Sequence, residues 1–277
     1  MTPFKSIIIL GGTHGNETNG VFYVKNYHKA LRAKYPHFDF HFIQVNEKAI
    51  AENRRFIDRD LNRLNHTSEF NDSEGSTLRD LREQFKTFDQ DSTFIFDLHT
   101  TTSHMGDCLV TTRKSELIDQ ILTRIQKTFP KTTILEGQNL DDESSFINNF
   151  FKNGLLVEIG PVANGVISHA IITSFDRLIQ QTLDCLTDLE STQKTSVQYE
   201  YYKSLGQINY PNHAKEITHF VDENICDWKE VREGDVLFRS ADEAVLHQGE
   251  SFYPCFVNEA GYQYEFKAML KTKKMMK

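Results

Sequence analysis

Two apolar runs of this chain are each followed by side chains that can bind a metal ion. His14 and Glu17, three residues apart, come after the run 6–10, and His99 comes after the run 93–96. Both runs are typical of buried strands, whose ends would present these polar groups. Two imidazoles and one carboxylate can hold a catalytic zinc ion and leave a position open for water. We therefore predict a zinc site here; the alternative is that both histidines are hydrogen-bonded strand-end residues.

Asp97 adds a second feature to this predicted site. It precedes His99 by two residues, and side chains two apart on a strand point to the same face. Carboxylates commonly orient the imidazole rings that bind a metal ion. We predict that Asp97 is such a partner of His99, the alternative being an ordinary acid at a strand end.

The segment 54–63 carries four arginines interleaved with aspartates, in a chain whose net charge is −8. Guanidinium groups bind carboxylates through paired hydrogen bonds and stabilise oxyanions. The segment is therefore a candidate for recognising an anionic substrate. The alternative is an exposed charged helix, because Arg55, Arg59 and Arg63 recur every four residues.

Glu158 is the one charged residue of the apolar run 154–160. A carboxylate in such surroundings is costly unless it is paired or its pKa rises. A raised pKa suits a general base that takes a proton from water and later gives it to a leaving amine. We favour this interpretation over a strand-end acid paired with an arginine, because the sequence offers no structural reason for its burial.

Strand-like and helix-like segments alternate over the first part of the chain. The expected strands are 6–10, 38–45, 94–98, 107–111 and 154–159. The expected helices are 18–33, 76–86, 115–129 and 167–189. This alternation predicts an α/β architecture in which helices flank a mainly parallel sheet.

The pattern changes near residue 192. The polar stretch 191–196 is typical of a linker, and short strand-like runs follow it. These runs are 197–202, 217–220, 235–238 and 252–257. We predict a catalytic zinc domain over residues 1–192 and a small β-rich domain over residues 197–277.

Charge and composition argue against several classes of protein. The acidic balance disfavours nucleic acid as the main partner. No apolar run approaches the ~20 residues of a membrane helix, and the N-terminus lacks the features of a signal peptide. The four cysteines are far apart and show no paired spacing. Such a pattern is typical of reduced thiols, so we expect a cytoplasmic protein.

At these residues the chain resembles the aspartoacylase branch of the aspartoacylase/succinylglutamate desuccinylase family, which is itself similar to zinc carboxypeptidases. The matching pieces are GGTHGNE, RFIDRDLNR, DLHTTTSHMGD, VEIGPVANGV and YPCFVNEAGY. They occur in the order of the family and span residues 11–262, nearly the whole chain. The resemblance implies a carboxypeptidase-like mixed sheet flanked by helices, with the β-rich C-terminal domain capping the entrance to the active site.

The resemblance also implies a role for each matching residue, in three groups. The zinc ligands would be His14, Glu17 and His99. The catalytic pair would be Glu158, as general base and acid, and Arg55, which would polarise the scissile carbonyl and stabilise the oxyanion. The substrate-binding group would be Asn62 and Arg63 on the α-carboxylate, Asp60 orienting its neighbours, and Tyr262 reaching in from the C-terminal domain.

The activity that the resemblance implies is zinc-dependent removal of the acyl group from an N-acyl amino acid. The first candidate substrate is N-acetyl-L-aspartate, which would give acetate and L-aspartate. Deacylation of aromatic or mercapturate-type N-acyl amino acids and desuccinylation of succinylglutamate are alternatives within the family. The non-enzymatic alternative is a protein that binds a metal ion or an amino acid. The partner would be a small molecule, and the resemblance allows a homo-oligomer.

Two positions depart from the aspartoacylase pattern. Aspartoacylases carry an arginine ten residues before the catalytic glutamate, and Asn148 occupies that position here. An amide cannot form the charge-assisted pair that such an arginine makes with the side-chain carboxylate of a substrate. Lys152 or another residue could substitute, the alignment could be shifted, or the substrate could differ. The second departure is Thr100, where aspartoacylases usually have asparagine.

Overall fold

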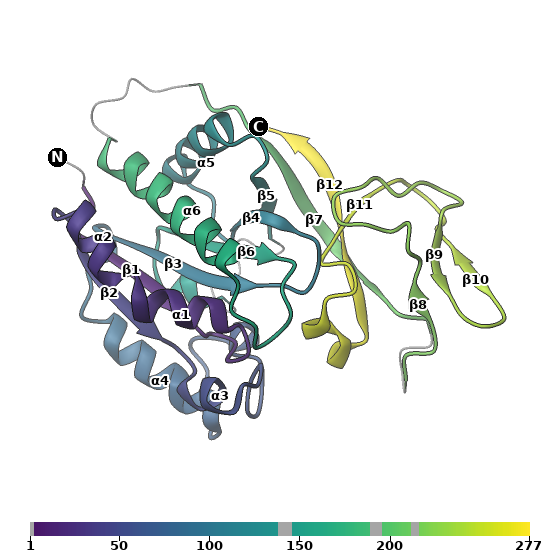
Figure 1. Cartoon of the computed structure of the whole chain (residues 1–277), viewed down its shortest axis with the longest axis horizontal. Helices are drawn as coiled ribbons and strands as arrows, with labels where there is room; N and C mark the ends of the chain where they lie inside the picture. The colour runs from purple at the N-terminus through teal and green to yellow at the C-terminus, as the bar shows by residue number, and fades with distance from the viewer. Residues whose placement is uncertain (1–2, 138–145, 189–195, 212–215) are drawn as a thin grey trace.

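The fold is built on one large mixed sheet with helices on both faces. The computed structural model describes residues 3–137, 146–188, 196–211 and 216–277 (Figure 1). The nine strands of the large sheet run in the order β11-β12-β7-β5-β4-β6-β3-β1-β2. Their bounds are β1 Ser6–Gly11, β2 Asp39–Gln44, β3 Thr93–Thr100, β4 Gly106–Thr111, β5 Thr133–Glu136, β6 Gly154–Gly160, β7 Glu200–Asn209, β11 Tyr253–Cys255 and β12 Lys267–Met276. This mixed α/β fold confirms the predicted fold class.

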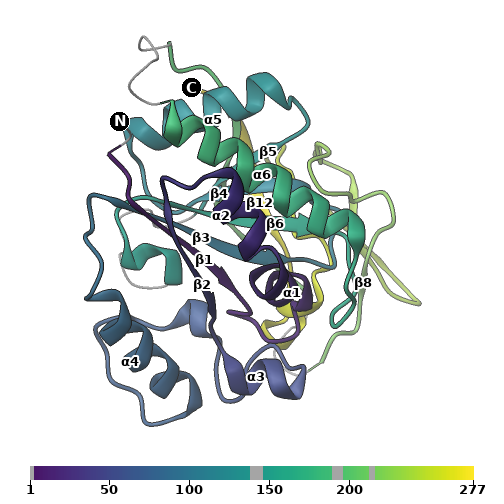
Figure 2. The same cartoon turned by 60° about the vertical axis from the view of Figure 1, so that its left-hand side comes forward.

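The helices divide between the two faces of the sheet because the residues of β1 alternate in direction. Ile7 and Ile9 belong to the core shared with α1, α5 and α6, whereas Ile8 and Leu10 belong to the core shared with α4. Figure 2 shows these two layers on opposite sides of the strands. The helices are α1 Thr18–Asn26, α2 His28–Lys34, α3 Glu47–Glu52, α4 Ser73–Phe85, α5 Glu116–Thr128 and α6 His169–Thr187, with 3-10 turns η1 Leu61–Arg63, η2 Ile147–Phe150 and η3 Ala260–Glu265.

Parallel pairing brings the predicted site residues to one edge of the sheet. Strands β1, β3 and β6 are neighbours and run in the same direction. Their carboxyl ends therefore meet at a single edge, where ligand sites of such sheets form. The register places His99 of β3 directly opposite Glu158 of β6. On the other side of β6, β4 runs antiparallel.

Two expected helices differ from the observed structure. The helix expected over 18–33 is two helices, α1 and α2, which meet at Tyr27. The charged helix that the arginine spacing of 54–63 allowed does not form, and only the short η1 turn is helical there. The arginine periodicity is therefore not a helical repeat, and the segment runs as an irregular loop along the site.

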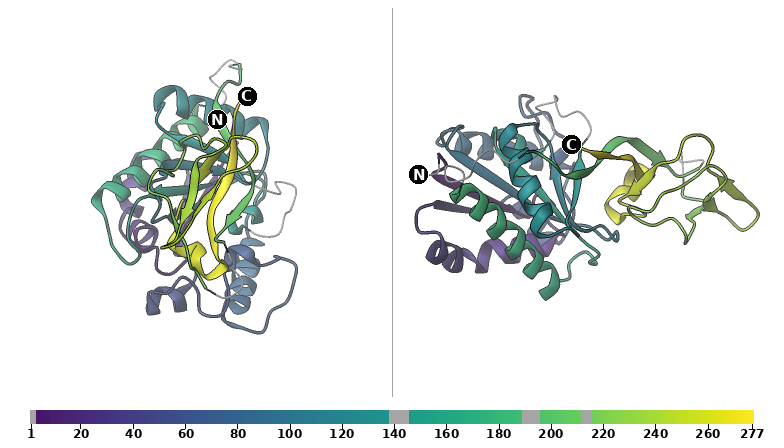
Figure 3. Two further views of the ribbon diagram at one scale, coloured as in Figure 1. Left: turned by 90° about the vertical axis from the view of Figure 1, so that its right-hand side faces the viewer. Right: turned by 90° about the horizontal axis from the view of Figure 1, so that it is seen from above.

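The C-terminal part of the chain contributes to both sheets. Strands β7 and β12 pair antiparallel, and β7 also pairs with β5, so the large sheet continues into this region. A separate small sheet contains β8 Phe220–Val221, β9 Val236–Arg239 and β10 Ala244–Leu246. Figure 3 shows this C-terminal region projecting beyond the helix-covered sheet. The sequence predicted short strands here but not their continuation of the main sheet.

Within the described ranges, no helix has the length and apolar character needed to cross a membrane. All four cysteines are free thiols, and of these only Cys226 is exposed.

Candidate metal centre and catalytic cavity

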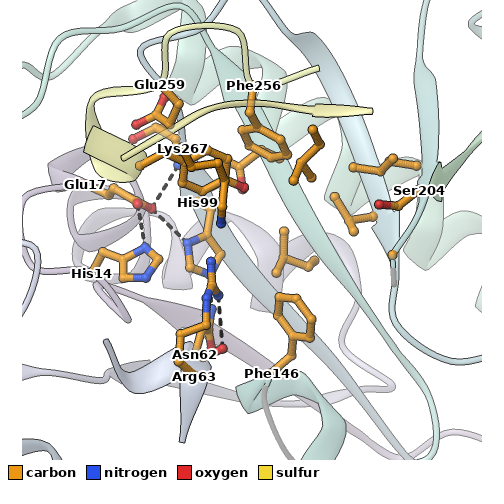
Figure 4. Close-up of a pocket in the computed structure, with 18 of the residues that line it drawn as sticks. His14, Glu17, Asn62, Arg63, His99, Phe146, Ser204, Phe256, Glu259 and Lys267 are labelled. Atoms are coloured by element: carbon orange, nitrogen blue, oxygen red, sulfur yellow. Dashed lines mark hydrogen bonds and ion pairs between the residues drawn. The ribbon is translucent and has the colours of Figure 1, made fainter. Parts of the chain in front are cut away.

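The side chains of His14, Glu17 and His99 converge at the carboxyl ends of β1 and β3 (Figure 4). The Glu17 carboxylate lies between the two rings. Its Oε1 is 2.6 Å from His14 Nδ1, and its Oε2 is 2.9 Å from His99 Nδ1. All three residues are buried, and one donor atom from each lies within 4.8 Å of the others. Two imidazole nitrogens and a carboxylate form a donor set that suits zinc.

The outer nitrogen of each imidazole ring faces a further carboxylate. His14 Nε2 lies 3.1 Å from Asp60 Oδ1, and His99 Nε2 lies 3.0 Å from Asp97 Oδ2. The other oxygen of Asp97 accepts a hydrogen bond from the Thr13 hydroxyl at 2.8 Å. An acid behind the ring fixes the orientation and tautomer of a histidine that ligates a metal ion. The structure thus places Asp97 where the sequence predicted it, and gives His14 an equivalent neighbour in Asp60.

The electrostatics of the cluster favour a cation between the rings and the carboxylate. Burial alone would raise the pKa of Glu17, but His14 and His99 outweigh it and hold that pKa well below its usual range. Burial alone would lower the pKa of His99, yet Asp97 and Glu17 hold it well above its usual value. The carboxylates that favour a proton on the ring would also favour a divalent cation, which competes with the proton for a ring nitrogen.

Arg55 reaches into the cluster from the loop before η1. Its Nη1 lies 3.3 Å from Glu17 Oε1, and its Nη2 lies 3.0 Å from Asp60 Oδ2. The C-terminal region approaches Arg55 closely, since a Cβ on Gly261 would lie 2.6 Å from Arg55 Nη1. The carboxylates of Glu17 and Asp60 hold the guanidinium beside the candidate metal ligands, where it can donate to a developing negative charge.

The loop that carries Arg55 is anchored from behind by Glu74 of α4. The fully buried Glu74 carboxylate accepts backbone hydrogen bonds from Ile57, Asp58 and Arg59 at 2.7, 2.9 and 3.3 Å. Those amides are thereby satisfied outside any helix. This contact explains why the arginine-rich segment is irregular.

Glu158 extends from β6 into the same cavity as the metal-ligand cluster. The residue is buried, and burial raises the pKa of its carboxyl well above the usual value, against the opposing influence of His99. Glu17 and Glu259 raise that pKa further. The buried acid expected from the sequence is therefore a carboxylate with raised proton affinity beside the candidate metal centre.

The cavity has a volume of about 290 Å³ and is shared by nearly all of the predicted site residues. The predicted residues that line it are His14, Glu17, Arg55, Asn62, Arg63, His99, Glu158 and Tyr262. Asp60 lies behind them, in contact with His14 and Arg55. Asn62 is held by the Ile147 amide, which donates to its Oδ1 at 3.1 Å.

Comparisons with known proteins match this architecture over both parts of the chain. Residues 3–186 match the family model of the succinylglutamate desuccinylase/aspartoacylase catalytic domain, and residues 197–274 match the AstE/AspA barrel-sandwich hybrid domain. The chain belongs to the succinylglutamate desuccinylase/aspartoacylase family.

Relatives of this chain are named after different substrates. A probable aspartoacylase of Trichodesmium erythraeum is 27% identical over 99% of this chain and 98% of its own length. The N-acyl-aromatic-L-amino acid amidohydrolase of Homo sapiens is 30% identical over 98% of this chain and 91% of its own length. The crystal structure of murine aminoacylase 3 matches with a TM-score of 0.89 at 25% identity, covering 100% of this chain and 97% of that one.

The positions that depart from the aspartoacylase pattern lie in distinct surroundings. Asn148 is buried and donates to Thr112 Oγ1 at 2.7 Å, and it does not line the cavity. Lys152 is exposed and pairs with Asp91 at 2.7 Å, so it does not replace the missing arginine. The Thr100 amide donates to Glu17 Oε2 at 3.0 Å, a contact that its backbone makes regardless of side chain.

Two further charged residues face the cavity and were not found from the sequence. Glu259 accepts a hydrogen bond from Thr102 N at 2.7 Å, which joins the segment after β3 to the C-terminal region, and a local one from Gly261 N at 2.8 Å. Lys267, the first residue of β12, is buried at the cavity wall. Glu259 could have been found from its place in the family motif NEAGY. Lys267 has no comparable signal, because it is one lysine among several near the C-terminus.

Proposed function

We propose that this protein is a zinc-dependent amidohydrolase that removes the acyl group from an N-acyl amino acid. The observation that carries this proposal is the convergence of the His14–Glu17–His99 cluster, Arg55 and Glu158 on one cavity. A family member with this donor set is expected to bind one zinc ion. When bound, the ion supplies a Lewis acid that polarises a carbonyl and acidifies water.

The residues of the chain supply the remaining chemistry. Glu158 takes a proton from the attacking water and later delivers it to the nitrogen of the leaving amine, a role that its raised pKa supports. Arg55 donates hydrogen bonds to the oxygen of the scissile carbonyl as negative charge develops there. Asn62 and Arg63 hold the α-carboxylate, and Tyr262 covers the substrate from the C-terminal side.

The first candidate substrate is N-acetyl-L-aspartate, hydrolysed to acetate and L-aspartate. The names of several relatives, including aspartoacylase of Mus musculus at 28% identity, support this choice. The cationic side chains at the cavity also support it, because a dicarboxylate needs more than one positive partner.

The second candidate is an N-acyl amino acid with an aromatic or other apolar side chain. An apolar wall at the cavity favours it. In addition, Asn148 stands where aspartoacylases carry an arginine for an acidic side chain, and Asn148 does not line the cavity, so that contact is missing here. Figure 4 shows Phe146 and Phe256 on this wall, away from the metal-ligand cluster. The apolar lining residues are Val110, Leu135, Phe146, Leu156, Phe256 and Leu270.

The test is amine release by the purified, zinc-loaded protein across matched substrates. They are N-acetyl-aspartate, N-acetyl-glutamate, N-acetyl-phenylalanine and N-succinyl-glutamate, each repeated with a chelator. We expect chelator-sensitive turnover with N-acetyl-aspartate preferred. A preference for N-acetyl-phenylalanine would favour the second candidate, and one for N-succinyl-glutamate would favour a desuccinylase. Bound zinc without turnover of any substrate would contradict the proposal and favour a binding protein.

A further inference from the structure

Lys267 is a buried lysine whose ammonium group has no role in the proposed chemistry. Its side chain is 7% exposed and lines the cavity that holds the candidate metal centre. In the view of Figure 4 it lies between the metal-ligand cluster and Phe256. A buried lysine is costly unless it is paired, so its placement at a cavity wall calls for an anion nearby.

Glu265 supplies part of that negative charge and fixes the position of the ammonium group. Its Oε2 lies 2.7 Å from Lys267 Nζ, while its Oε1 accepts a hydrogen bond from Tyr264 OH at 2.9 Å. The same Oε1 lies 3.9 Å from Arg63 Nε. Glu265 does not line the cavity, so it holds Lys267 from behind and also faces Arg63.

The ring of Tyr262 lies on another side of Lys267. The Nζ atom is 4.1 Å from the ring centroid, a cation–π contact that also restricts the lysine. Burial and the neighbouring arginines lower the pKa of Lys267, whereas Glu265 opposes this shift. The ammonium is thus held in place by one carboxylate and one ring, with donor capacity remaining, because an ammonium group has three N–H donors.

Among the described residues that line the cavity, the lysine and arginine side chains are Arg55, Arg63 and Lys267. Arg55 is engaged by Glu17 and Asp60, and the proposed function assigns it to the carbonyl oxygen. Arg63 is assigned to the α-carboxylate. Lys267 therefore remains as the cation available to a second anionic group of the substrate.

We propose that Lys267 is a specificity-determining residue that binds the side-chain carboxylate of an acidic N-acyl amino acid, with Glu265 as its positioning residue. This inference rests on the proposed function, and it names the substrate class of the same site. Lys267 would supply the cation that Asn148 does not, from a different element of the fold. The apolar wall would then contact the methylene groups or the acyl chain of the substrate.

The test compares N-acetyl-L-aspartate with N-acetyl-L-asparagine, which has nearly the same shape and no side-chain charge. The variants are Lys267→Met, which keeps the length of the side chain, and Lys267→Arg, which keeps its charge. Lys271→Met is the matched control, because Lys271 lies on the same strand but contacts the Phe252 ring outside the cavity. Zinc content and circular dichroism verify that each variant is folded.

We expect Lys267→Met to lower kcat/KM for N-acetyl-aspartate by about 10- to 100-fold, the loss of one charge-assisted hydrogen bond. Turnover of N-acetyl-asparagine should change by no more than about twofold, within the scatter of a surface substitution. Lys267→Arg should keep most of the preference, and Lys271→Met should leave it intact. An unchanged preference in Lys267→Met, or a wild-type protein that prefers N-acetyl-asparagine, would overturn the inference.

A binding measurement separates this inference from the proposed function. The equilibrium affinities of both ligands are measured by calorimetry on zinc-loaded Glu158→Gln protein, with and without Lys267→Met. A preference for N-acetyl-aspartate that disappears with Lys267→Met supports the inference even if the wild-type protein hydrolyses neither ligand, a result that would count against the proposed function alone. Equal affinities with Lys267 present would overturn the inference whatever the activity.

Discussion

Glu158 and His99 lie opposite each other on the neighbouring parallel strands β6 and β3, but burial has the larger effect on the Glu158 carboxyl. Burial raises the pKa of Glu158, while the nearby His99 ring lowers it and the acids Glu17 and Glu259 raise it again. The net effect is a raised pKa, so this carboxylate accepts a proton readily, as the proposed general base requires.

Replacing Glu158 by glutamine tests this role. Because the amide keeps the shape but cannot accept the proton, we expect kcat to fall by about 10²- to 10⁴-fold with zinc content unchanged. Steady-state kinetics and metal analysis measure the two quantities. Glu136→Gln, a buried acid on β5 that does not line the cavity, is the control. Substantial residual turnover in Glu158→Gln would remove this residue from the mechanism.

Arg63 is expected to act mainly in binding. We predict that Arg63→Ala raises KM by about 10- to 100-fold and lowers kcat less, because the α-carboxylate pair is present in ground and transition states alike. Arg59→Ala is the matched control, since Arg59 belongs to the same segment but pairs with Asp72 at 2.6 Å. A loss confined to kcat would contradict the binding role.

Individual site residues differ in how far the sequence could predict them. His14 and Glu17 follow β1 and His99 lies near the end of β3, so strand-end position and donor chemistry together predicted that the three would lie close together. Lys267 could not be found in this way, because its significance depends on the position of β12 beside β7, a contact between distant segments. Propensity and spacing carry no information about such contacts.

At the scale of elements, the loop before η1 depends on one acid of α4. Glu74 accepts three backbone hydrogen bonds from the loop and a fourth from Asn46 Nδ2 at 2.9 Å. These donors outweigh the effect of burial and lower the pKa of Glu74 below its usual value of 4.5. The helix thereby positions Arg55, although none of its own side chains lines the cavity.

We predict that Glu74→Gln lowers the free energy of unfolding by about 1.5–3 kcal/mol at neutral pH. A carboxyl whose pKa is lower in the folded state stabilises the fold above its unfolded pKa and loses that effect as the pH falls. The difference from wild type should therefore be full near pH 7 and shrink below the usual value of 4.5. Urea unfolding across this range measures it, and an equal difference at every pH would contradict the assignment.

The alternating elements of residues 1–187 were largely predictable, because buried strands and amphipathic helices leave clear periodic patterns. The arginine spacing was misleading, since it matched a helical period in a segment whose amides bind Glu74 instead. The sequence also could not predict that β7, β11 and β12 belong to the large sheet. Short strands can pair with either of two sheets, and only tertiary packing selects one.

At the scale of the whole molecule, the cavity lies where the C-terminal region meets the main sheet. Glu259 joins the two through hydrogen bonds from Thr101 Oγ1 and Thr102 N, and the indole of Trp228 donates to Met105 O at 2.9 Å. These contacts keep Tyr262 and Lys267 against a cavity whose proposed catalytic groups come from the other part of the chain.

We predict that Glu259→Gln lowers kcat/KM by about 10- to 100-fold while zinc content stays the same, because the amide leaves some of these donors unpaired and displaces the covering residues. Kinetics and metal analysis distinguish this effect from loss of the metal site. Glu250→Gln, an exposed acid of the same region, is the control. Wild-type kinetics in Glu259→Gln would show that the connection is dispensable.

We propose above all that the His14–Glu17–His99 cluster binds one zinc ion on which hydrolysis depends. The most direct test removes metal with a chelator, titrates zinc back into the protein, and records amine release from N-acetyl-L-aspartate and N-acetyl-phenylalanine at each step. We predict that activity rises with added zinc and stops rising at one equivalent per chain, and that His99→Ala protein shows no such rise. Activity that survives chelation, or that zinc restores equally in His99→Ala, would contradict the claim.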